Sequence, residues 1–362
     1  MPSGPHLGLE TKKIAIDRAL EVFLTGATHT LSTIDPHLRP ISLALSDFLS
    51  GGKRLRPLFA IAGYLSAGGE MEDSHNAGSS IYQAVVSLEL LQACALIHDD
   101  MMDGSDTRRG APSMHRRFAQ EHRNRSGVGD SDDFGHSAAL LLGDLALVLS
   151  SQALHQSGIS QEQLQLVNPL FDTMKIELMA GQYLDMHASS REKVEIDDAL
   201  KIAIFKSGKY TIERPLHFGG ALAQCSHELL DIYSQYGIPL GVAFQLRDDL
   251  LGVFGDTSVT GKPAGDDLLE GKRTALISYA LEHLSDSEVK EFATLFGNRQ
   301  APIEAIERMR TLITHSGAVE FIEKIITERT TLALEAAANP RITSSGRELL
   351  AELAIAATRR SA

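Results

Sequence analysis

The chain has 362 residues, of which 43% are hydrophobic and 22% charged, a composition that builds a packed core and excludes a disordered or collagen-like chain. Its 47 acidic and 34 basic residues leave a net charge of -13, which argues against general nucleic-acid binding because such a field repels phosphate backbones. Cys94 and Cys225 are too few for a disulfide framework or a cysteine-based zinc site, so we expect a cytoplasmic protein.

The N-terminal residues have no signal-peptide pattern, and no run of about 18 uncharged apolar residues predicts a membrane span. Apolar residues recur at helical spacing through most of the chain, which predicts an all-α protein. The expected helices cover residues 10–26, 36–50, 56–67, 77–103, 112–124, 135–156, 161–188, 196–224, 227–254, 272–284, 286–296, 302–315, 317–338 and 345–360.

Local signals mark several helix ends. Ser285 and Glu288 fit a capping box, and Pro57 and Pro112 suit the first turns of helices. No long linker divides the chain, so we expect one helical domain over residues 1–362, large enough to favour self-association.

The first acidic motif closes a long apolar helix with Asp99, Asp100 and Asp103. Residues four apart on a helix have Cβ atoms about 5–6 Å apart, and carboxylates at that spacing repel each other, so a cation should lie between them. Oxygen ligands of this kind suit Mg2+. Taken alone, the motif is more often a solvated acidic helix end.

A second acidic motif raises the weight of the metal hypothesis. Asp248 and Asp249 close another apolar helix, and a further pair, Asp266 and Asp267, follows the segment that contains Lys262. Two facing acidic helix ends would hold divalent metals, and a diphosphate is the natural guest of such a cage. Lys262 and Lys272, each taken alone, fit solvated surface residues better.

Two basic clusters accompany the acidic motifs. Residues 51–57, GGKRLRP, put three cations at a glycine-containing turn that leads into a helix, and Arg108 and Arg109 follow the first acidic motif. Both clusters fit anion sites, although ordinary basic turns explain each one equally well. P-loop, nucleophile-elbow and HExxH zinc-protease motifs are absent from the sequence.

The segments GGKRLRP, LIHDDMMDGSDTRRG, MAGQYLD, FKSGKYT, FQLRDDLLGVFGD and GKPAGDDLLEGKR, in this order over about residues 50–273, resemble the trans-isoprenyl diphosphate synthases, or polyprenyl synthetases. The likeness is greatest to bacterial geranylgeranyl diphosphate synthases. The resemblance implies a single large helical bundle of the isoprenoid synthase type with a central cavity. It also implies a Mg2+-dependent prenyltransferase, usually a homodimer, that condenses isopentenyl diphosphate with dimethylallyl, geranyl or farnesyl diphosphate.

The resemblance further implies roles for individual residues. Asp99, Asp103 and Asp248 would ligate Mg2+. Asp100, Asp185, Asp249 and Asp266, with Gln182 and Gln245, would support the metals. Arg108, Lys206 and Lys262 would contact the allylic diphosphate, with Ser207 and Lys272 as further substrate-binding residues. Lys53, Arg56, Gln92 and Arg109 would bind isopentenyl diphosphate.

Two positions depart from the family pattern. Gln92 stands where many members have His, and Gln donates a hydrogen bond but cannot become cationic. Gly252 stands where the second motif commonly has a third Asp, which removes a carboxylate that Asp256 is not expected to replace.

The residues before the first acidic motif predict the product. Ala95 and Cys94 lie four and five positions before Asp99, about 6–7.5 Å along the helix, where bulky aromatics in the resembling family stop chain growth. Both are small here, so we expect geranylgeranyl diphosphate, with Leu91 and Leu88 as the floor of the cavity.

Other functions remain open at this point. A farnesyl or longer-chain polyprenyl synthase would share all the motifs. A terpene cyclase needs no second diphosphate pocket, so the basic turn argues against it, and a non-catalytic synthase subunit would be expected to have lost acidic residues. Contact of the protein with a membrane surface through a lipophilic product is also open.

Overall fold

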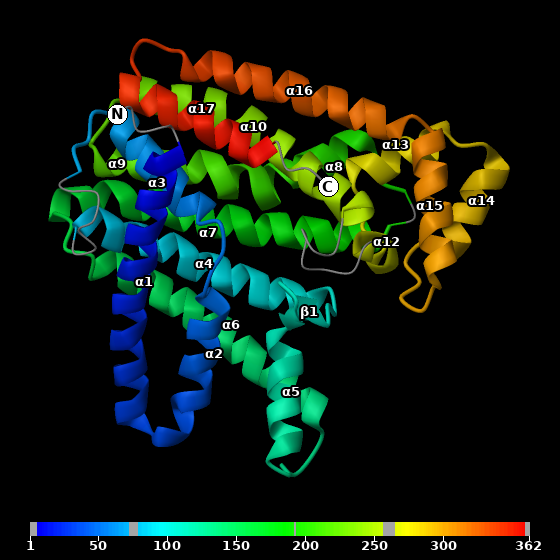
Figure 1. The fold of residues 1–362 in the computed structure, drawn as a ribbon, viewed down its shortest axis with the longest axis horizontal. Coiled ribbons are helices and arrows are strands. Elements are labelled where there is room, and N and C mark those ends of the chain that lie inside the picture. The colour runs from blue at the N-terminus through cyan, green and yellow to red at the C-terminus, as the bar shows by residue number, and fades with distance from the viewer. Residues whose placement is uncertain (1–5, 72–78, 192, 256–264, 359–362) are drawn as a thin grey trace. The chain divides into compact units, whose positions relative to one another are not determined.

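A computed structural model describes residues 6–71, 79–191, 193–255 and 265–358 (Figure 1). These residues are almost entirely helical, and the only described strands form a two-residue antiparallel hairpin, which confirms the expected all-α class. The elements are α1 (His6–Ile34), η1 (Pro36–Leu38), α2 (Arg39–Leu49), α3 (Leu55–Ser66), α4 (Ser80–Met102), β1 (Thr107–Arg108), β2 (Ala111–Pro112), α5 (Met114–Asn124), α6 (Ser131–His155), α7 (Gln161–Ser189), α8 (Ile196–Ile202), the π-helix η2 (Ala203–Glu213), α9 (Arg214–Leu222), α10 (His227–Phe254), α12 (Asp266–Glu270), α13 (Ala275–His283), α14 (Asp286–Leu295), α15 (Ile303–His315), α16 (Ala318–Ala337) and α17 (Ser344–Thr358).

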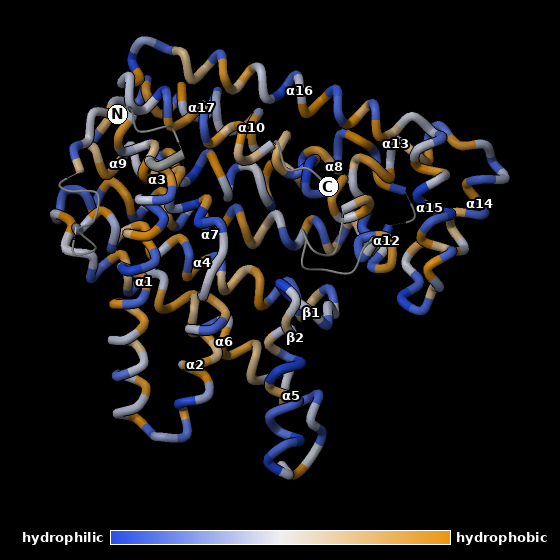
Figure 2. The backbone as a smooth tube through the Cα atoms, in the orientation of Figure 1, coloured by the Kyte–Doolittle hydropathy of each residue, from blue (hydrophilic) through white to orange (hydrophobic). Residues whose placement is uncertain are grey.

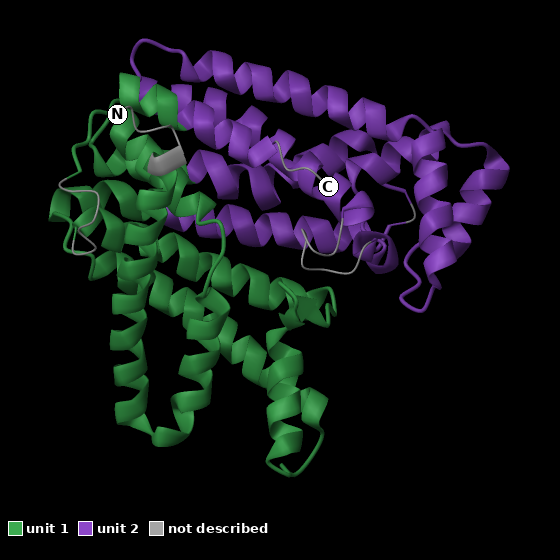
Figure 3. Cartoon of the chain, in the orientation of Figure 1, with its two compact units in different colours: residues 1–170, 215–226, 343–349 green, residues 171–214, 227–342, 350–362 purple. Residues whose placement is uncertain are grey.

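The chain divides into two compact units (Figure 3). Unit 1 contains residues 1–170, 215–226 and 343–349, and unit 2 contains residues 171–214, 227–342 and 350–362. The single domain expected from the sequence remains a prediction.

Helix α4 is the central element of unit 1, where it packs against α1, α2, α3 and α6. Its sequence is apolar almost all round, so side chains on every side of the helix, from Ile81 to Ile97, are buried. A helix of this kind is stable only when neighbours cover all its faces. The acidic residues therefore emerge at its C-terminal end, at the edge of a rigid core.

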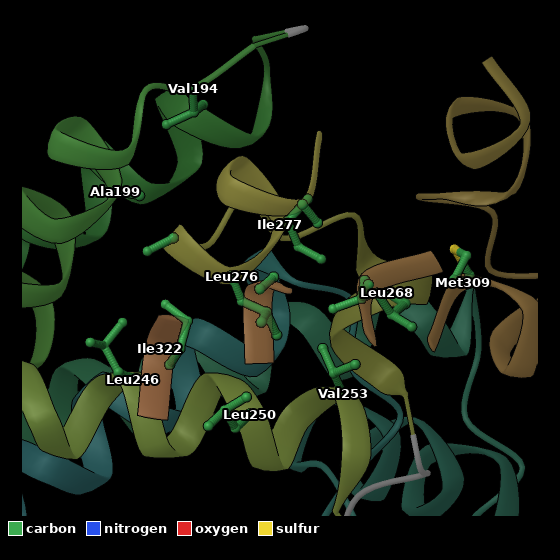
Figure 4. Close-up of a cluster of buried hydrophobic side chains, with 14 of the residues drawn as sticks. Val194, Ala199, Leu246, Leu250, Val253, Leu268, Leu276, Ile277, Met309 and Ile322 are labelled. Carbon is green, nitrogen blue, oxygen red and sulfur yellow. The ribbon is translucent and has the colours of Figure 1, made fainter. Parts of the chain in front are cut away.

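Helix α10 has the same role in unit 2, where it packs against α16, η2, α12 and α13. Leu246, Leu250 and Val253 recur at helical spacing and belong to one buried cluster with Leu276 and Ile322 (Figure 4). This cluster fixes the last turns of α10, which carry the second acidic motif.

Most of the expected helices agree with the structure. The range 227–254 is that of α10, and the capping box of Ser285 and Glu288 is present at the start of α14. Pro57 lies in the first turn of α3 as expected. The expectation for Pro112 was wrong, because this residue lies in β2 and Ser113 precedes the first turn of α5.

The sequence also missed two kinds of local structure. The expected helix 196–224 is helical throughout, but residues 203–213 form a π-helix, and the short helix α12 was not expected. Each of these segments is too short for its apolar residues to show a recognisable spacing in the sequence.

Two helices, α4 and α6, are long and apolar enough to cross a membrane, with mean hydropathies of 1.5 and 1.6 over 18-residue windows. The α4 window is 72% buried within the protein, as expected for a core helix, whereas the α6 window is 44% buried. In Figure 2, α6 is largely hydrophobic, whereas α5 beside it in the same unit is largely hydrophilic.

Candidate active site

The first acidic motif lies at the C-terminal end of α4 in unit 1. Asp99 is half-buried, the Asp100 carboxylate is 1% exposed, and Asp103 caps the helix. Arg108, which the resemblance assigned to the allylic diphosphate, contacts Asp100 of this motif. Its Nε donates to both carboxylate oxygens of Asp100, at 3.0 and 3.1 Å, and its Nη2 also donates to Asp100.

Arg108 also faces the rest of the motif, because its Nη2 lies 3.6 Å from Asp99 Oδ2. Burial lowers the pKa of Arg108, but Asp100, Asp99 and Asp103 together outweigh this effect and raise it. Arg108 therefore offsets one of the three negative charges of the first acidic motif, and the remaining negative charge favours a bound cation.

The β1–β2 hairpin places the two arginines of the second basic cluster. Thr107 pairs with Pro112 and Arg108 with Ala111, so Arg109 and Gly110 form a two-residue turn. Both have positive φ, 53° and 75°, as a type I′ hairpin turn requires. Arg108 consequently points to Asp100, while Arg109 occupies the tip of the hairpin.

The tip of the hairpin meets the first basic cluster. A Cβ atom added to Gly52 would lie 3.2 and 3.3 Å from Nη2 and Nη1 of Arg109, so the guanidinium packs on the backbone of the glycine turn. Lys53 is exposed and Arg56 is half-buried at the start of α3. Unit 1 thus brings Arg109 to the basic turn, as the isopentenyl diphosphate hypothesis requires.

The remaining predicted residues of unit 1 lie along α4. Leu88, Leu91 and Cys94 are fully buried, whereas Gln92 and Ala95 are half-buried. The helical period places Leu88, Gln92 and Ala95 on the Asp99 face of the helix. Oε1 of Gln92 is buried and has no hydrogen-bond partner within the described parts of the chain.

Cys94 lies on a different face of α4. Its Sγ is 3.8 Å from Nδ1 of His98, and Nε2 of His98 is 3.2 Å from the Leu140 carbonyl oxygen on α6. Burial and the charge of Asp144 raise the pKa of the Cys94 thiol to about 12, so it is not a nucleophile at neutral pH.

The second acidic motif lies in the last two turns of α10 in unit 2. Asp249 is buried, and its Oδ1 accepts a 2.7 Å hydrogen bond from Nε2 of Gln245. The pKa of Asp249 is raised to about 8. Burial is the main cause, and the charges of Asp267, Asp248 and Asp185 raise the pKa further, whereas the hydrogen bond from Gln245 lowers it. These carboxylates are therefore a concentration of negative charge that favours a bound cation.

Asp267 is a site residue that the sequence analysis did not select, since Asp266 was chosen from the same pair. A Cβ atom added to Gly252 would overlap the carboxylate of Asp267, which therefore lies against α10. Its Oδ1 is 3.2 Å from Nζ of Lys272. The charge of Asp267 contributes to the raised pKa of Asp249. No apolar period in the sequence fixes where the five-residue helix α12 begins, so this contact was not predictable.

The π-helix η2 carries Lys206 and Ser207, both half-buried. Nζ of Lys206 donates to Oδ2 of Asp185 on α7 at 2.5 Å. The next residue, Gly208, allows η2 to approach α10 closely, because an added Cβ would lie 3.1 Å from the backbone of Gly241. π-Helical turns are frequent at functional sites.

The predicted residues thus form one group in each unit. Unit 2 brings together Asp185, Lys206, Asp248 and Asp249. Gln182, three residues before Asp185, and Asp266, directly before Asp267, are both half-buried. Lys262 and Asp256 lie outside the described residues.

The donor chemistry of both acidic motifs fits Mg2+. All the candidate ligands are carboxylate oxygens, the hard donors that Mg2+ prefers, and the motifs contain no His or Cys ligand. Within the ranges that the structure describes, no group of three or more His, Cys, Asp or Glu side chains converges enough to hold a metal. A ligand that brings its own oxygens, such as a diphosphate, would complete the coordination.

The fold and the acidic motifs together define the class of isoprenoid synthases. The polyprenyl synthetase family model matches residues 39–313, and the chain belongs to this family. The expected resemblance is therefore confirmed.

Individual relatives agree with this assignment. The structure of geranylgeranyl pyrophosphate synthase from Corynebacterium glutamicum, complexed with isoprenyl diphosphate and magnesium, is 39% identical, has a TM-score of 0.91, and the match covers 98% of this chain and 99% of that one. A Caulobacter crescentus polyprenyl synthase, complexed with calcium and isoprenyl diphosphate, is 26% identical with a TM-score of 0.73, covering 96% and 98%. The geranylfarnesyl diphosphate synthase of Aeropyrum pernix is 31% identical, covering 76% of this chain and 79% of the relative.

Proposed function

We propose that the protein is a Mg2+-dependent prenyltransferase that condenses isopentenyl diphosphate with allylic diphosphates and releases mainly geranylgeranyl diphosphate. The observation that carries this proposal is the hairpin of unit 1. It sends Arg108 to the acidic motif and Arg109 to the basic turn, so one small element serves two anion sites. A terpene cyclase, which takes one diphosphate substrate, has no need of the second.

Each acidic motif would contribute ligands for the allylic diphosphate and its metal. In unit 1, Asp99 and Asp103 would ligate Mg2+, and Asp100 would support them. In unit 2, Asp248 would ligate Mg2+, with support from Asp185, Asp249, Asp266 and Asp267. When bound, Mg2+ neutralises the allylic diphosphate and assists the departure of its oxygen as a Lewis acid. Arg108 already pairs with Asp100 of the first motif, and Lys206 pairs with Asp185 on α7. The remaining N–H groups of these two side chains can donate to diphosphate oxygens.

The basic turn provides the isopentenyl site. Lys53, Arg56 and Arg109 supply fixed positive charge where no metal is expected, and the half-buried Gln92 can donate an amide hydrogen bond. These residues would hold the homoallylic substrate with its double bond toward the allylic carbon. Such positioning lowers the activation barrier, because two substrates held side by side react in an effectively unimolecular step.

The bonds change in a balanced sequence. The allylic C–O bond breaks and its electron pair leaves with the diphosphate; the isopentenyl double bond attacks the allylic cation and forms a C–C bond. A proton is then lost from the new cation to the released diphosphate. The protein contributes electrostatic stabilisation and exclusion of water, and no side chain acts as a nucleophile.

Product analysis tests this proposal. Purified protein, isopentenyl diphosphate, Mg2+ and each allylic starter should yield geranylgeranyl diphosphate as the main product, with no turnover in excess chelator. Cyclic products would contradict condensation. A main product with five more carbons would favour a longer-chain synthase, the second candidate, which the name of the Aeropyrum relative supports.

We further propose a homodimer that forms through α6. Phe134, Leu141 and Val148 recur every seven residues on this helix and are 47%, 61% and 65% exposed. Such an apolar stripe is the pattern of a helix that pairs with another helix. Sedimentation should show a dimer at micromolar concentration, and Leu141→Glu should weaken it.

We also propose a cytoplasmic location, in which any contact of the protein with a membrane is peripheral.

A further inference from the structure

Arg54 is a buried arginine in the middle of the basic turn. Its side chain is 3% exposed, whereas the neighbouring Lys53 is exposed to solvent. Its backbone is left-handed, with φ 52° and ψ 32°, a conformation that residues other than Gly, Asn and Asp rarely adopt. Such strain persists only where surrounding contacts hold it in place.

Three elements of unit 1 hold Arg54. Its Nε donates to Oδ1 of Asp17 on α1 at 2.7 Å, and its Nη1 donates to Oε2 of Glu89 on α4 at 2.7 Å. Its Nη2 donates to the carbonyl oxygen of Leu49 at the end of α2, at 2.6 Å. All three nitrogens of the guanidinium are thus engaged away from the substrate side, so Arg54 anchors the turn instead of contacting a diphosphate.

Glu89 links this anchor to the hairpin. Its side chain is 8% exposed, and it lies ten residues before Asp99 on the rigid helix α4. Partial burial lowers the pKa of Arg109, and so do Arg54 and Arg108, while the charge of Glu89 opposes them. The charge of Glu89 therefore opposes the repulsion between Arg54 and Arg109. The Arg109 guanidinium packs on Gly52, two residues before Arg54 in the same turn.

We propose that Glu89 and Arg54 are a positioning pair that assembles the metal-free diphosphate pocket from the basic turn and the hairpin tip. This inference rests on the proposed function. Arg54 fixes the backbone so that Lys53 points outward, and Glu89 allows Arg109 to lie against the same turn. Neither residue touches the substrate.

Glu89→Gln is the most informative variant, because Gln keeps an oxygen acceptor for Nη1 of Arg54 and removes only the charge. We expect the KM for isopentenyl diphosphate to rise by about tenfold or more, since small displacements of binding groups cost that much. The KM for the allylic substrate should change less than twofold. Arg54→Gly should raise the same KM, because the anchor is lost while Gly tolerates the left-handed backbone. It should also lower the melting temperature, because the buried Glu89 loses its arginine partner.

Glu323→Gln is the control for the substitution itself, at a carboxylate that is 44% exposed. Glu323 receives two 2.7 Å hydrogen bonds from Arg247 in unit 2, so the same substitution weakens another arginine–carboxylate pair. It should leave both KM values unchanged. A purely structural role of Glu89 would instead lower the melting temperature and kcat of Glu89→Gln without separating the two KM values, and that result would overturn the proposal.

Calorimetry of isopentenyl diphosphate binding in EDTA separates this inference from the proposed function. Wild type should bind without metal, and Glu89→Gln should bind about tenfold more weakly. If wild type binds isopentenyl diphosphate without metal and Glu89→Gln binds it more weakly, but the protein shows no turnover, the synthase function is refuted and the positioning pair is not. Absence of metal-free binding by wild type, or equal affinities of the two proteins, would refute the positioning pair even if the enzyme condenses its substrates.

Discussion

The carboxylate of Asp267 occupies the space that a side chain at Gly252 would need. Gly252 is the position at which the second acidic motif lacks its common third Asp, and the chain fills this place with a carboxylate from a separate helix, α12. The charge of Asp267 reaches Asp249, whose pKa burial and the neighbouring carboxylates raise to about 8. The carboxylate of Asp267 therefore lies where the side chain of an Asp at position 252 would begin.

This relationship predicts different roles for the two members of the acidic pair. Asp267→Asn should reduce kcat and apparent Mg2+ affinity by roughly 10- to 100-fold, the usual cost of removing a group that supports metal ligands. Gly252→Ala should have a similar effect because its methyl group displaces the same carboxylate. Asp266→Asn is the control, and steady-state kinetics over a range of Mg2+ should show a smaller change. Equal losses in Asp266→Asn and Asp267→Asn would contradict the assignment.

Asp99 and Asp100 should differ in their effect on stability. Asp99→Ala, like Asp248→Ala, should lower turnover by several powers of ten while the fold survives, because it removes a half-buried like charge. Asp100→Ala should in addition destabilise the protein by about 3–5 kcal/mol, because Arg108 would lose its buried carboxylate partner. Thermal unfolding would distinguish them. An unchanged melting temperature in Asp100→Ala would show that Arg108 is stabilised in another way.

Substitutions in the basic turn should weaken the binding of isopentenyl diphosphate and leave the binding of the allylic substrate unchanged. Lys53→Ala or Arg56→Ala should raise the KM for isopentenyl diphosphate roughly 10- to 100-fold, since one charge-assisted hydrogen bond contributes about 1.5–3 kcal/mol. The KM for the allylic substrate should remain close to that of wild type. Initial rates with each substrate varied in turn provide the measurement, and equal effects on both would mean that the turn is not a separate pocket.

The sequence predicted most of this architecture because long apolar periods define long helices. The bounds of α10 are those of the predicted segment, and the acidic residues at the ends of α4 and α10 are evident in the amino-acid sequence. Features set by tertiary contacts were not predictable. The inward side chain of Arg54 depends on Asp17 and Glu89, which lie 37 and 35 residues away. Asp267 likewise depends on a close approach of α12 to α10 that no local pattern encodes.

His115 on α5 should make stability depend on pH. It is 2% exposed, lies 3.2 Å from the Ser113 hydroxyl and stacks on His136. Burial, with the charges of His136 and Arg116, lowers its pKa from 6.5 to about 4, although Asp106 and Asp132 oppose the shift. Between these values the unfolded chain binds the proton more tightly than the folded protein, so stability is complete above pH 6.5 and decreases as pH falls toward 4.

The expected loss at pH 5 is roughly 2 kcal/mol relative to neutral pH. His115→Gln, which is neutral at every pH, should lack this component while retaining the contributions of all other titrating groups. Urea unfolding of both proteins at neutral pH and at pH 5 would provide the test. Parallel decreases in unfolding free energy would show that His115 is protonated normally in the folded state.

Chain length should depend on Ala95 more than on Cys94. Ala95 is half-buried on the Asp99 face of α4, about 6 Å before the acidic motif, so a prenyl tail anchored at Asp99 would pass it. Cys94 is fully buried and faces His98, away from that path. Ala95→Phe should therefore shift the main product toward farnesyl diphosphate without a large change in stability.

Cys94→Phe should behave differently, because a ring cannot fit between α4 and its neighbours without strain of about 1–3 kcal/mol. Its main effect should be a lower melting temperature, with a smaller change in product length. Chromatographic sizing of products from both variants, beside their thermal unfolding, separates the two roles. If Cys94→Phe shortens the product and Ala95→Phe does not, the tail follows the Cys94 face of α4 and not the Asp99 face, which carries Ala95 and Leu88.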